Sequence, residues 1–156
     1  MADPSAVPAA LGGVDAPFAG AKVALIHGDR LVTYLRDDIP TIPYPGRWDL
    51  PGGGREGGET SEACVLRETY EEFGLRMGAD RLIWKRRYVS ATDPRDAAYF
   101  FVAPVSADEI AGVRFGDEGQ YWQMMGFAEF LDHPQAVPAL QARFAAYLSE
   151  GHGASA

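Results

Sequence analysis

The sequence predicts an α/β domain in which helices pack on the faces of a mixed sheet. Its segments are ordered as a hairpin, a glycine-rich loop, a helix, further strands and a terminal helix, which is not the regular alternation of a doubly wound parallel sheet. The 156 residues are enough for one domain with a single core. Among them, 18 glycines and 11 prolines argue against a long helical bundle and favour a loop-rich mixed fold.

The two ends of the chain differ in composition from its middle. Residues 1–16 are rich in Ala, Pro and Gly and have no hydrophobic period, so we expect a flexible N-terminal arm. We expect one folded domain over residues 17–150 and a flexible C-terminal tail over residues 151–156.

The first elements of that domain are expected to be strands. Two runs rich in β-forming residues within residues 22–36 flank Gly28-Asp29, a pair typical of a hairpin turn. Three prolines in residues 37–46 predict an irregular loop. Residues 48–51 are then expected to form a short extended piece.

A glycine loop followed by a helix is the most specific part of the pattern. Five glycines lie between residues 52 and 58, and they allow tight bends and a close approach of the backbone to a ligand. Thr60 or Ser61 can cap a helix that continues to Phe73. Gly74 is well placed as the left-handed residue that ends this helix.

The second half of the chain contains both the alternating hydrophobic pattern of strands and the hydrophobic spacing of helices. Alternating and apolar runs predict strands, and apolar residues at helical spacing predict helices. The expected strands cover residues 81–90, 97–105 and 118–125, and the expected helices cover residues 127–131 and 137–148.

The net charge of −8 limits the classes of partner. Such a surface repels nucleic acid polymers and anionic membranes, so we expect neither as a partner. The single cysteine can form no internal disulfide, and no apolar run is long enough to span a membrane. We therefore expect a cytoplasmic protein that is a monomer or a homodimer, and an anionic small substrate remains possible if a cation bridges it to the protein.

Three glutamates share one face of the predicted helix. Glu68, Glu71 and Glu72 are spaced by three and four residues, so their carboxylates lie within about one turn of each other. Repulsion between such neighbours costs roughly 0.2–0.5 kcal/mol per pair. A bound divalent cation would offset it. A solvated acidic face supported by Arg67 is the alternative, but the adjoining glycine loop favours a site for a cation and phosphate oxygens.

The loop and the helix together resemble the Nudix box, the signature of the Nudix hydrolases. The segment Trp48-Asp-Leu-Pro-Gly52 also resembles the usual lead-in to that motif. Thr69 departs from the family, which usually carries a bulkier aliphatic residue there, and we expect its hydroxyl to bond to the carbonyl of Val65. The positions that carry the resemblance are Gly53, Glu59, Arg67, Glu68, Tyr70, Glu71, Glu72, Phe73, Gly74 and Leu75.

The resemblance implies the Nudix fold, an α/β/α sandwich around a mixed sheet, over residues 17–150. It also implies a site for Mg²⁺ (or Mn²⁺). In that site Glu68, Glu71, Glu72 and the Gly53 carbonyl would bind the metal, while Glu59 and Arg67 would brace the helix.

The general base is left open by the resemblance. Some Nudix enzymes use the glutamate that corresponds to Glu68, and others use an acid from a loop after the later strands. Glu118 is the candidate for that loop acid and for a further metal ligand, with Asp117 as the neighbouring alternative. Both glutamates can contribute if Glu68 is mainly a ligand.

Three arginines on predicted strands are candidate contacts to substrate phosphate or base: Arg36, Arg86 and Arg87. The resemblance implies a divalent-metal-dependent pyrophosphohydrolase that cleaves a nucleoside diphosphate linked to another moiety. Nucleoside triphosphates, including oxidised ones, would give the monophosphate and pyrophosphate. Alternatives are a hydrolase of nucleotide sugars or dinucleoside polyphosphates, and a non-catalytic Nudix-fold nucleotide sensor. The presence of all three box glutamates favours an enzyme that acts on phosphoric anhydride bonds.

Overall fold

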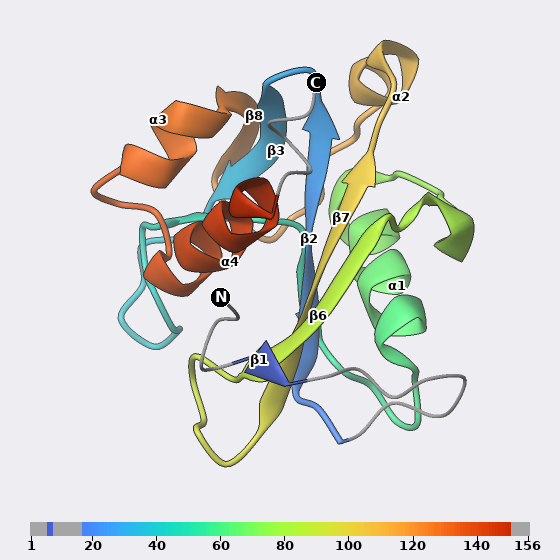
Figure 1. The fold of residues 1–156 in the computed structure, drawn as a ribbon. Coiled ribbons are helices and arrows are strands. Elements are labelled where there is room, and N and C mark those ends of the chain that lie inside the picture. Colours follow the sequence, from blue (N-terminus) through green and yellow to red (C-terminus); the bar gives the residue numbers. More distant parts are fainter. Residues whose placement is uncertain (1–5, 8–16, 151–156) are drawn as a thin grey trace.

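One mixed sheet runs through the computed structural model, which describes residues 6–7 and 17–150 (Figure 1). In this part of the chain eight strands are ordered β1-β6-β7-β2-β3-β4, with β5 paired to β2 and β8 paired to β3. Strands β2 and β7 run parallel, and the other strand pairs are antiparallel. The strands are β1 (Ala6–Val7), β2 (Gly20–His27), β3 (Arg30–Leu35), β4 (Trp48–Asp49), β5 (Gly52–Gly54), β6 (Trp84–Val89), β7 (Ala97–Pro104) and β8 (Tyr121–Gly126).

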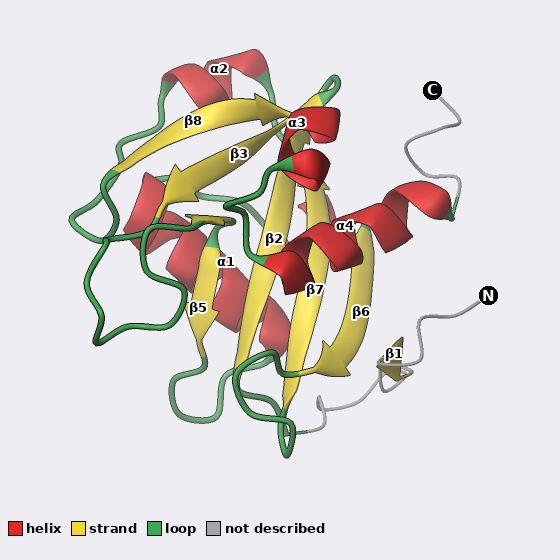
Figure 2. Cartoon of the chain, turned by 90° about the vertical axis from the view of Figure 1, so that its left-hand side faces the viewer, coloured by secondary structure: helices red, strands yellow, loops and turns green. Residues whose placement is uncertain are grey.

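Helices cover both faces of this sheet, so the predicted α/β/α arrangement is confirmed. Helix α1 (Ser61–Phe73) lies on one face. Helices α3 (Phe127–Asp132) and α4 (Pro138–Ser149) lie on the other (Figure 2). A β-sheet whose faces are both covered in this way buries the side chains of both faces.

Strand β7 shows how the sheet divides the interior into two cores. Tyr99 and Phe101 pack in the core on the α1 side. Phe100 and Val102 pack in the core on the α4 side. Because successive side chains of a strand point to opposite faces, this continuous apolar run serves both cores at once.

The first hairpin is confirmed. Strands β2 and β3 are paired directly around the turn, with His27 opposite Arg30. Gly28 supplies a φ of +61° in that turn, a backbone conformation that favours glycine.

The first three glycines of the expected loop instead form strand β5, which pairs with β2. Gly52 has a φ of +130°, and a Cβ there would lie 2.1 Å from the carbonyl oxygen of Ala21. Glycine is therefore required at this position because it lets the two backbones approach. Only the later part, around Gly57, turns back toward α1, with a φ of +55°.

The ends of α1 match their sequence signals. The Thr60 hydroxyl accepts a hydrogen bond from the Ala63 N–H, and Gly74 closes the helix with a φ of +69°. The expectation for Thr69 is wrong. Its side chain is fully buried, and its hydroxyl has no hydrogen-bond partner among the described residues, Val65 included. The helix is therefore not loosened by a bond back to its own backbone.

Two short helical segments were not expected. A 3₁₀ turn (Ala79–Arg81) delays the start of β6, which begins at Trp84 rather than at residue 81. Helix α2 (Ala107–Ala111) starts with a reciprocal pair of hydrogen bonds between Ser106 and Glu109, a capping box that the sequence contains.

Most of the expected N-terminal arm and the expected C-terminal tail lie outside the described residues; from the arm, Ala6 and Val7 pair with β6. In the described part of the chain, no helix has the length and apolar character needed to cross a membrane.

Candidate active site

A cavity of about 500 Å³ lies between α1, the strands β2 to β5 and the start of α4. It brings together several predicted residues that are distant in the sequence. Glu68 and Glu72 reach it from α1, Arg36 from the end of β3, and Glu118 from the loop before β8. The backbone of Gly53 also lines it.

Glu72 is the deepest of the box carboxylates. The residue is 8% exposed, and its Oε1 accepts a hydrogen bond of 2.8 Å from the Gly52 N–H. Burial raises the pKa of Glu72 to about 8, against the opposing effects of Lys22 and the Gly52 hydrogen bond. A carboxyl group that loses so much hydration favours a nearby cation, because a positive charge would restore its ionised form.

Glu68 lies against the glycine strand. A Cβ on Gly53 would be 2.5 Å from Glu68 Oε2, so a larger residue there would displace this carboxylate from its present position. Burial raises the pKa of Glu68, although Arg67 Nη1, at 2.9 Å from Oε1, acts in the opposite direction.

Arg67 fixes this end of the helix to the loop before it. Its Nε donates to Glu59 Oε2 at 2.6 Å, and its Nη2 donates to the Gly54 carbonyl at 2.9 Å. The hydrogen bonds with Glu59 raise the pKa of Arg67, so the guanidinium is ionised. The bracing role expected of Glu59 and Arg67 agrees with these contacts.

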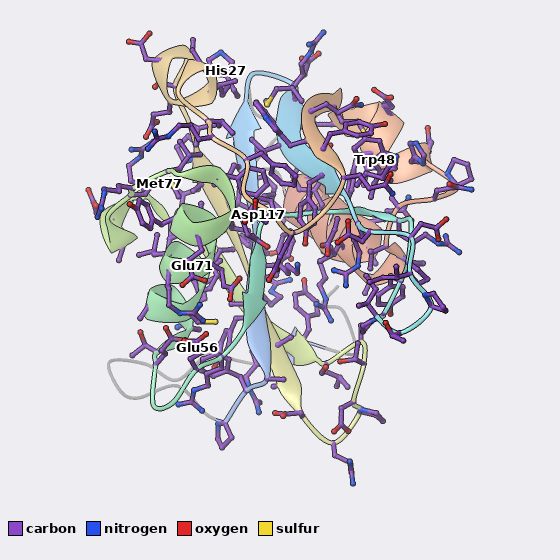
Figure 3. All side chains as sticks on the ribbon, turned by 180° about the vertical axis from the view of Figure 1, so that it is seen from behind. His27, Trp48, Glu56, Glu71, Met77 and Asp117 are labelled. Atoms are coloured by element: carbon purple, nitrogen blue, oxygen red, sulfur yellow. The ribbon has the colours of Figure 1, made fainter. Side chains whose placement is uncertain are left out.

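Glu71 is more exposed than Glu68 and is joined to it through Arg67, whose Nη1 donates to both carboxylates. Its side chain is 54% exposed and pairs with Arg67 Nη1 at 3.1 Å, and it does not line the cavity. Figure 3 labels Glu71 on α1 and Asp117 in the segment before β8. The helical wheel places three carboxylates on one face, but in the structure Glu68 and Glu72 line the cavity and Glu71 does not.

The donor set at the cavity suits a hard divalent cation. Two carboxylates, Glu68 and Glu72, adjoin the backbone of Gly53, and oxygen atoms are the ligands that Mg²⁺ and Mn²⁺ prefer. In the part of the chain that the structure describes, no three His, Cys, Asp or Glu side chains already form a metal-holding group. The two carboxylates fit a cation that is completed by waters and substrate phosphate.

The loop that carries Glu118 is anchored to the end of β3. The Gln120 N–H donates to the Leu35 carbonyl at 2.8 Å, and the Gly119 N–H donates to Asp37 Oδ2 at 3.3 Å. Glu118 lines the cavity, whereas Asp117 does not. Between the two candidate loop acids, the geometry therefore favours Glu118.

A buried ion cluster centred on Asp49, which is 3% exposed, also lines the cavity. Its Oδ2 accepts hydrogen bonds from Arg36 Nη1 at 2.7 Å, Lys22 Nζ at 3.1 Å and Tyr34 OH at 3.1 Å. Burial alone would raise the pKa of Asp49, but Lys22 and Arg36 outweigh it and hold the pKa below its usual range.

The structure does not bring Arg86 and Arg87 to this cavity. Arg86 Nη2 donates to Glu150 Oε1 at 2.9 Å, and its guanidinium lies 4.4 Å from the centre of the Trp84 ring. Arg87 follows on the opposite face of β6, by the alternation of the strand. The substrate contacts expected on β6 were inferred from charge alone. The sequence does not show which edge of the sheet carries the site.

Sequence reasoning missed Lys22 and Asp49 as site residues. Asp49 stands between Trp48 and Leu50 in a segment expected to be extended. A carboxylate flanked by large apolar residues signals a buried charge that needs a cation. Lys22, at the start of an apolar strand, carries the matching signal.

Comparison with known proteins identifies the family to which this chain belongs. The family model described as NUDIX domain matches residues 18–148. Human diphosphoinositol polyphosphate phosphohydrolase 3-alpha is 36% identical over 68 residues, which are 44% of this chain and 40% of that protein. The putative 8-oxo-dGTP diphosphatase 2 of Mycobacterium tuberculosis is 39% identical over 54 residues, 35% of this chain and 37% of that protein. The chain thus spans about two-fifths of the length of these relatives.

Solved structures agree on the fold. The MutT protein from Methanosarcina mazei has a TM-score of 0.68 at 20% identity, covering 90% of this chain and 99% of that one. The Nudix hydrolase RenU from M. smegmatis has a TM-score of 0.65 at 16% identity, covering 96% and 97%. At these identities the likeness establishes the fold alone.

Proposed function

Because this chain belongs to the NUDIX domain family, we propose that it is a divalent-metal-dependent pyrophosphohydrolase. Its substrate would be a nucleoside diphosphate linked to another moiety, with nucleoside triphosphates as the leading case. The products would then be a nucleoside monophosphate and pyrophosphate.

One observation carries the proposal: two box carboxylates and two cations line the same cavity. Glu68 and Glu72 supply oxygen ligands suited to Mg²⁺ (or Mn²⁺), together with the Gly53 carbonyl. Lys22 and Arg36 supply positive charge. A metal-bound diphosphate requires both features, because the metal takes some phosphate oxygens and the protein must stabilise the others.

The proposed reaction is attack of water on one phosphorus of the anhydride. The new P–O bond forms as the bond from the attacked phosphorus to the bridging oxygen breaks, and the leaving phosphate or pyrophosphate keeps that oxygen and the bonding electron pair. Glu68 or Glu118 accepts the proton of the attacking water. A bound Mg²⁺ would screen the phosphate charges and make that water more acidic. Arg36 would hold phosphate oxygens, while Arg67 keeps Glu68 in place.

The remainder of the cavity favours a nucleoside over a polyphosphorylated ring. Its remaining lining includes Ala98, Val137, Leu140 and Tyr44, with Arg143, whose Nη2 donates to the Val89 carbonyl, as one further cation. An inositol polyphosphate, the substrate type named for the human relative, would need more than this one cation for its additional phosphates. An uncharged base and sugar, as in the oxidised nucleotide named for the mycobacterial relative, suit apolar walls better.

A substrate screen with and without Mg²⁺ tests the proposal. Nucleoside triphosphates, nucleotide sugars, dinucleoside polyphosphates and diphosphoinositol polyphosphates are each assayed for released phosphate or pyrophosphate. We expect metal-dependent turnover of at least one nucleotide, and labelling of one product when the reaction runs in ¹⁸O-water. Nucleotide binding without turnover, in a single-turnover assay with Mg²⁺, would indicate a sensor instead.

A further inference from the structure

Asp49 binds two cavity-lining cations, Lys22 from β2 and Arg36 from the end of β3. Besides its bonds to Arg36, Lys22 and Tyr34, its Oδ1 accepts a hydrogen bond of 2.6 Å from the Leu50 N–H. Four donors thus fix a carboxylate that is almost fully buried. Such a group has one orientation, and the partners it holds are fixed with it.

One arm of the cluster leads to Arg36. Asp49 binds Nη1, and the Pro43 carbonyl accepts from Nε at 2.9 Å. Two hydrogen bonds to different atoms of a planar guanidinium set the direction of the whole group. The Arg36 side chain is 20% exposed and lines the cavity.

The second arm leads through Lys22 to Glu72. Lys22 Nζ donates to Asp49 and, at 3.1 Å each, to the carbonyls of Leu50 and Gly52. Asp49 therefore anchors the Lys22 ammonium group, which binds the Gly52 carbonyl. The N–H of the same glycine binds Glu72, so the position of Glu72 depends on this chain of contacts.

Neither cation would keep its place without the carboxylate. Lys22 and Arg36 both bind one oxygen, Oδ2, and both side chains are mostly buried. Removing the negative charge leaves two cations that repel each other in a region of low dielectric, and the side chains must move apart or toward solvent.

We propose that Asp49 is a positioning residue for both parts of the site: it aims Arg36 at the substrate diphosphate and, through Lys22 and Gly52, holds Glu72 in its metal-binding orientation. The Arg36 arm rests on the proposed function. The Glu72 arm concerns metal binding and stands whether or not a nucleotide is cleaved.

The Asp49→Asn variant of the full chain is the first test, since it keeps the size of the side chain and removes its charge. We expect Mn²⁺ affinity, followed by electron paramagnetic resonance without substrate, to fall roughly ten- to a hundredfold, as for other groups that orient metal ligands. We expect KM for the nucleotide to rise by a similar factor. The matched control is Glu109→Gln, which removes the charge from an arginine pair outside the cavity and should change neither quantity.

A double-mutant cycle separates positioning from a general structural effect. If Asp49 acts on the substrate through Arg36, Asp49→Asn raises KM much less when Arg36 is already Met. Likewise, Asp49→Asn weakens Mn²⁺ binding much less when Lys22 is already Met. Independent, additive effects in both cycles would overturn the proposal.

Arg36→Lys keeps the inference testable if Asp49→Asn does not fold. Lysine retains the charge but cannot bind Asp49 and Pro43 in the same planar geometry. KM should rise almost as much as in Arg36→Met, and a KM equal to that of the unmodified protein would refute the Arg36 arm. If no nucleotide is turned over, the proposed function fails, while the Mn²⁺ measurements on Asp49→Asn or, failing its folding, on Lys22→Met still decide the Glu72 arm.

Discussion

The two ion clusters beside the cavity have opposite designs. Around Arg67, one cation is shared by several acids at the edge of the protein, and they include Glu56, whose side chain is 71% exposed. Around Asp49, one acid is shared by two cations in the interior. The first cluster is redundant, and two of its acids, Glu56 and Glu71, are exposed, whereas the second depends on one buried acid, Asp49.

The two clusters therefore differ in what the loss of one acid does to the side chains that remain. Losing one acid near Arg67 leaves the guanidinium with other partners, and exposed pairs contribute little to stability. Losing Asp49 leaves buried cations without their common partner. Counting ionic contacts would treat the clusters as equivalent, but burial makes their roles unequal.

The largest expected effect lies within the Arg67 cluster itself. Glu68→Gln should lower kcat on the order of a thousandfold, because this carboxylate lines the cavity and, in the proposed reaction, binds the metal or accepts the proton of the attacking water. Glu56→Gln, in the same cluster, should leave kcat nearly unchanged. Steady-state kinetics on the two variants, with folding checked by circular dichroism, makes the comparison. Equal losses would mean that the cluster acts as a unit.

The next largest expected difference between the two clusters is in their contribution to the free energy of unfolding. We expect Asp49→Ala to lower the free energy of unfolding by about 3–5 kcal/mol, because it breaks a buried ionic cluster. Glu56→Ala should change it by less than about 0.5 kcal/mol. Urea denaturation of both variants measures these values, and comparable losses would contradict the contrast between buried and exposed clusters.

A pH dependence should appear in the metal-free protein. Burial raises the pKa of Glu72 from 4.5 to about 8, so between these values the folded state binds more protons than the unfolded state. Stability from this group is therefore lost as pH rises from about 5 to 8. In EDTA, the Tm of Glu72→Gln should gain on that of the unmodified protein over this range, and Mg²⁺ should reverse the gain. A constant Tm difference would show that Glu72 does not titrate there.

The smallest expected effect concerns Thr69, a buried polar group with no partner among the described residues. Thr69→Val keeps the shape and removes the unsatisfied hydroxyl, so stability should rise by about 1 kcal/mol. The kcat should not change, because Thr69 does not line the cavity. Thermal unfolding and the standard assay measure both, and a loss of stability would reveal a partner for the hydroxyl.

Local signals in the sequence predicted much of the fold. The Gly28 turn, the Thr60 cap and the Gly74 end of α1 each depend on neighbouring residues, and each is found as expected. Strand β5 could not be predicted in this way. Its pairing with β2 is set by the approach of two distant backbones, which a run of glycines permits but does not specify.

The candidate site was partly predictable for the same reason. Helical spacing brings Glu68 and Glu72 to one face, but it does not show that Glu71, beside Arg67, stays exposed and outside the cavity. Asp49 gains its importance only when the sheet places it against Lys22 and Arg36. Such long-range pairing depends on topology, and spacing within one segment does not reveal it.

Whether Glu68, Glu72 and Gly53 form one metal site is tested most directly by a crystal structure with Mg²⁺ and a non-hydrolysable nucleotide. We expect the ion between the two carboxylates and the Gly53 carbonyl, with a phosphate oxygen of the nucleotide among its ligands. An ion bound elsewhere, with the two carboxylates turned apart, would contradict the assignment.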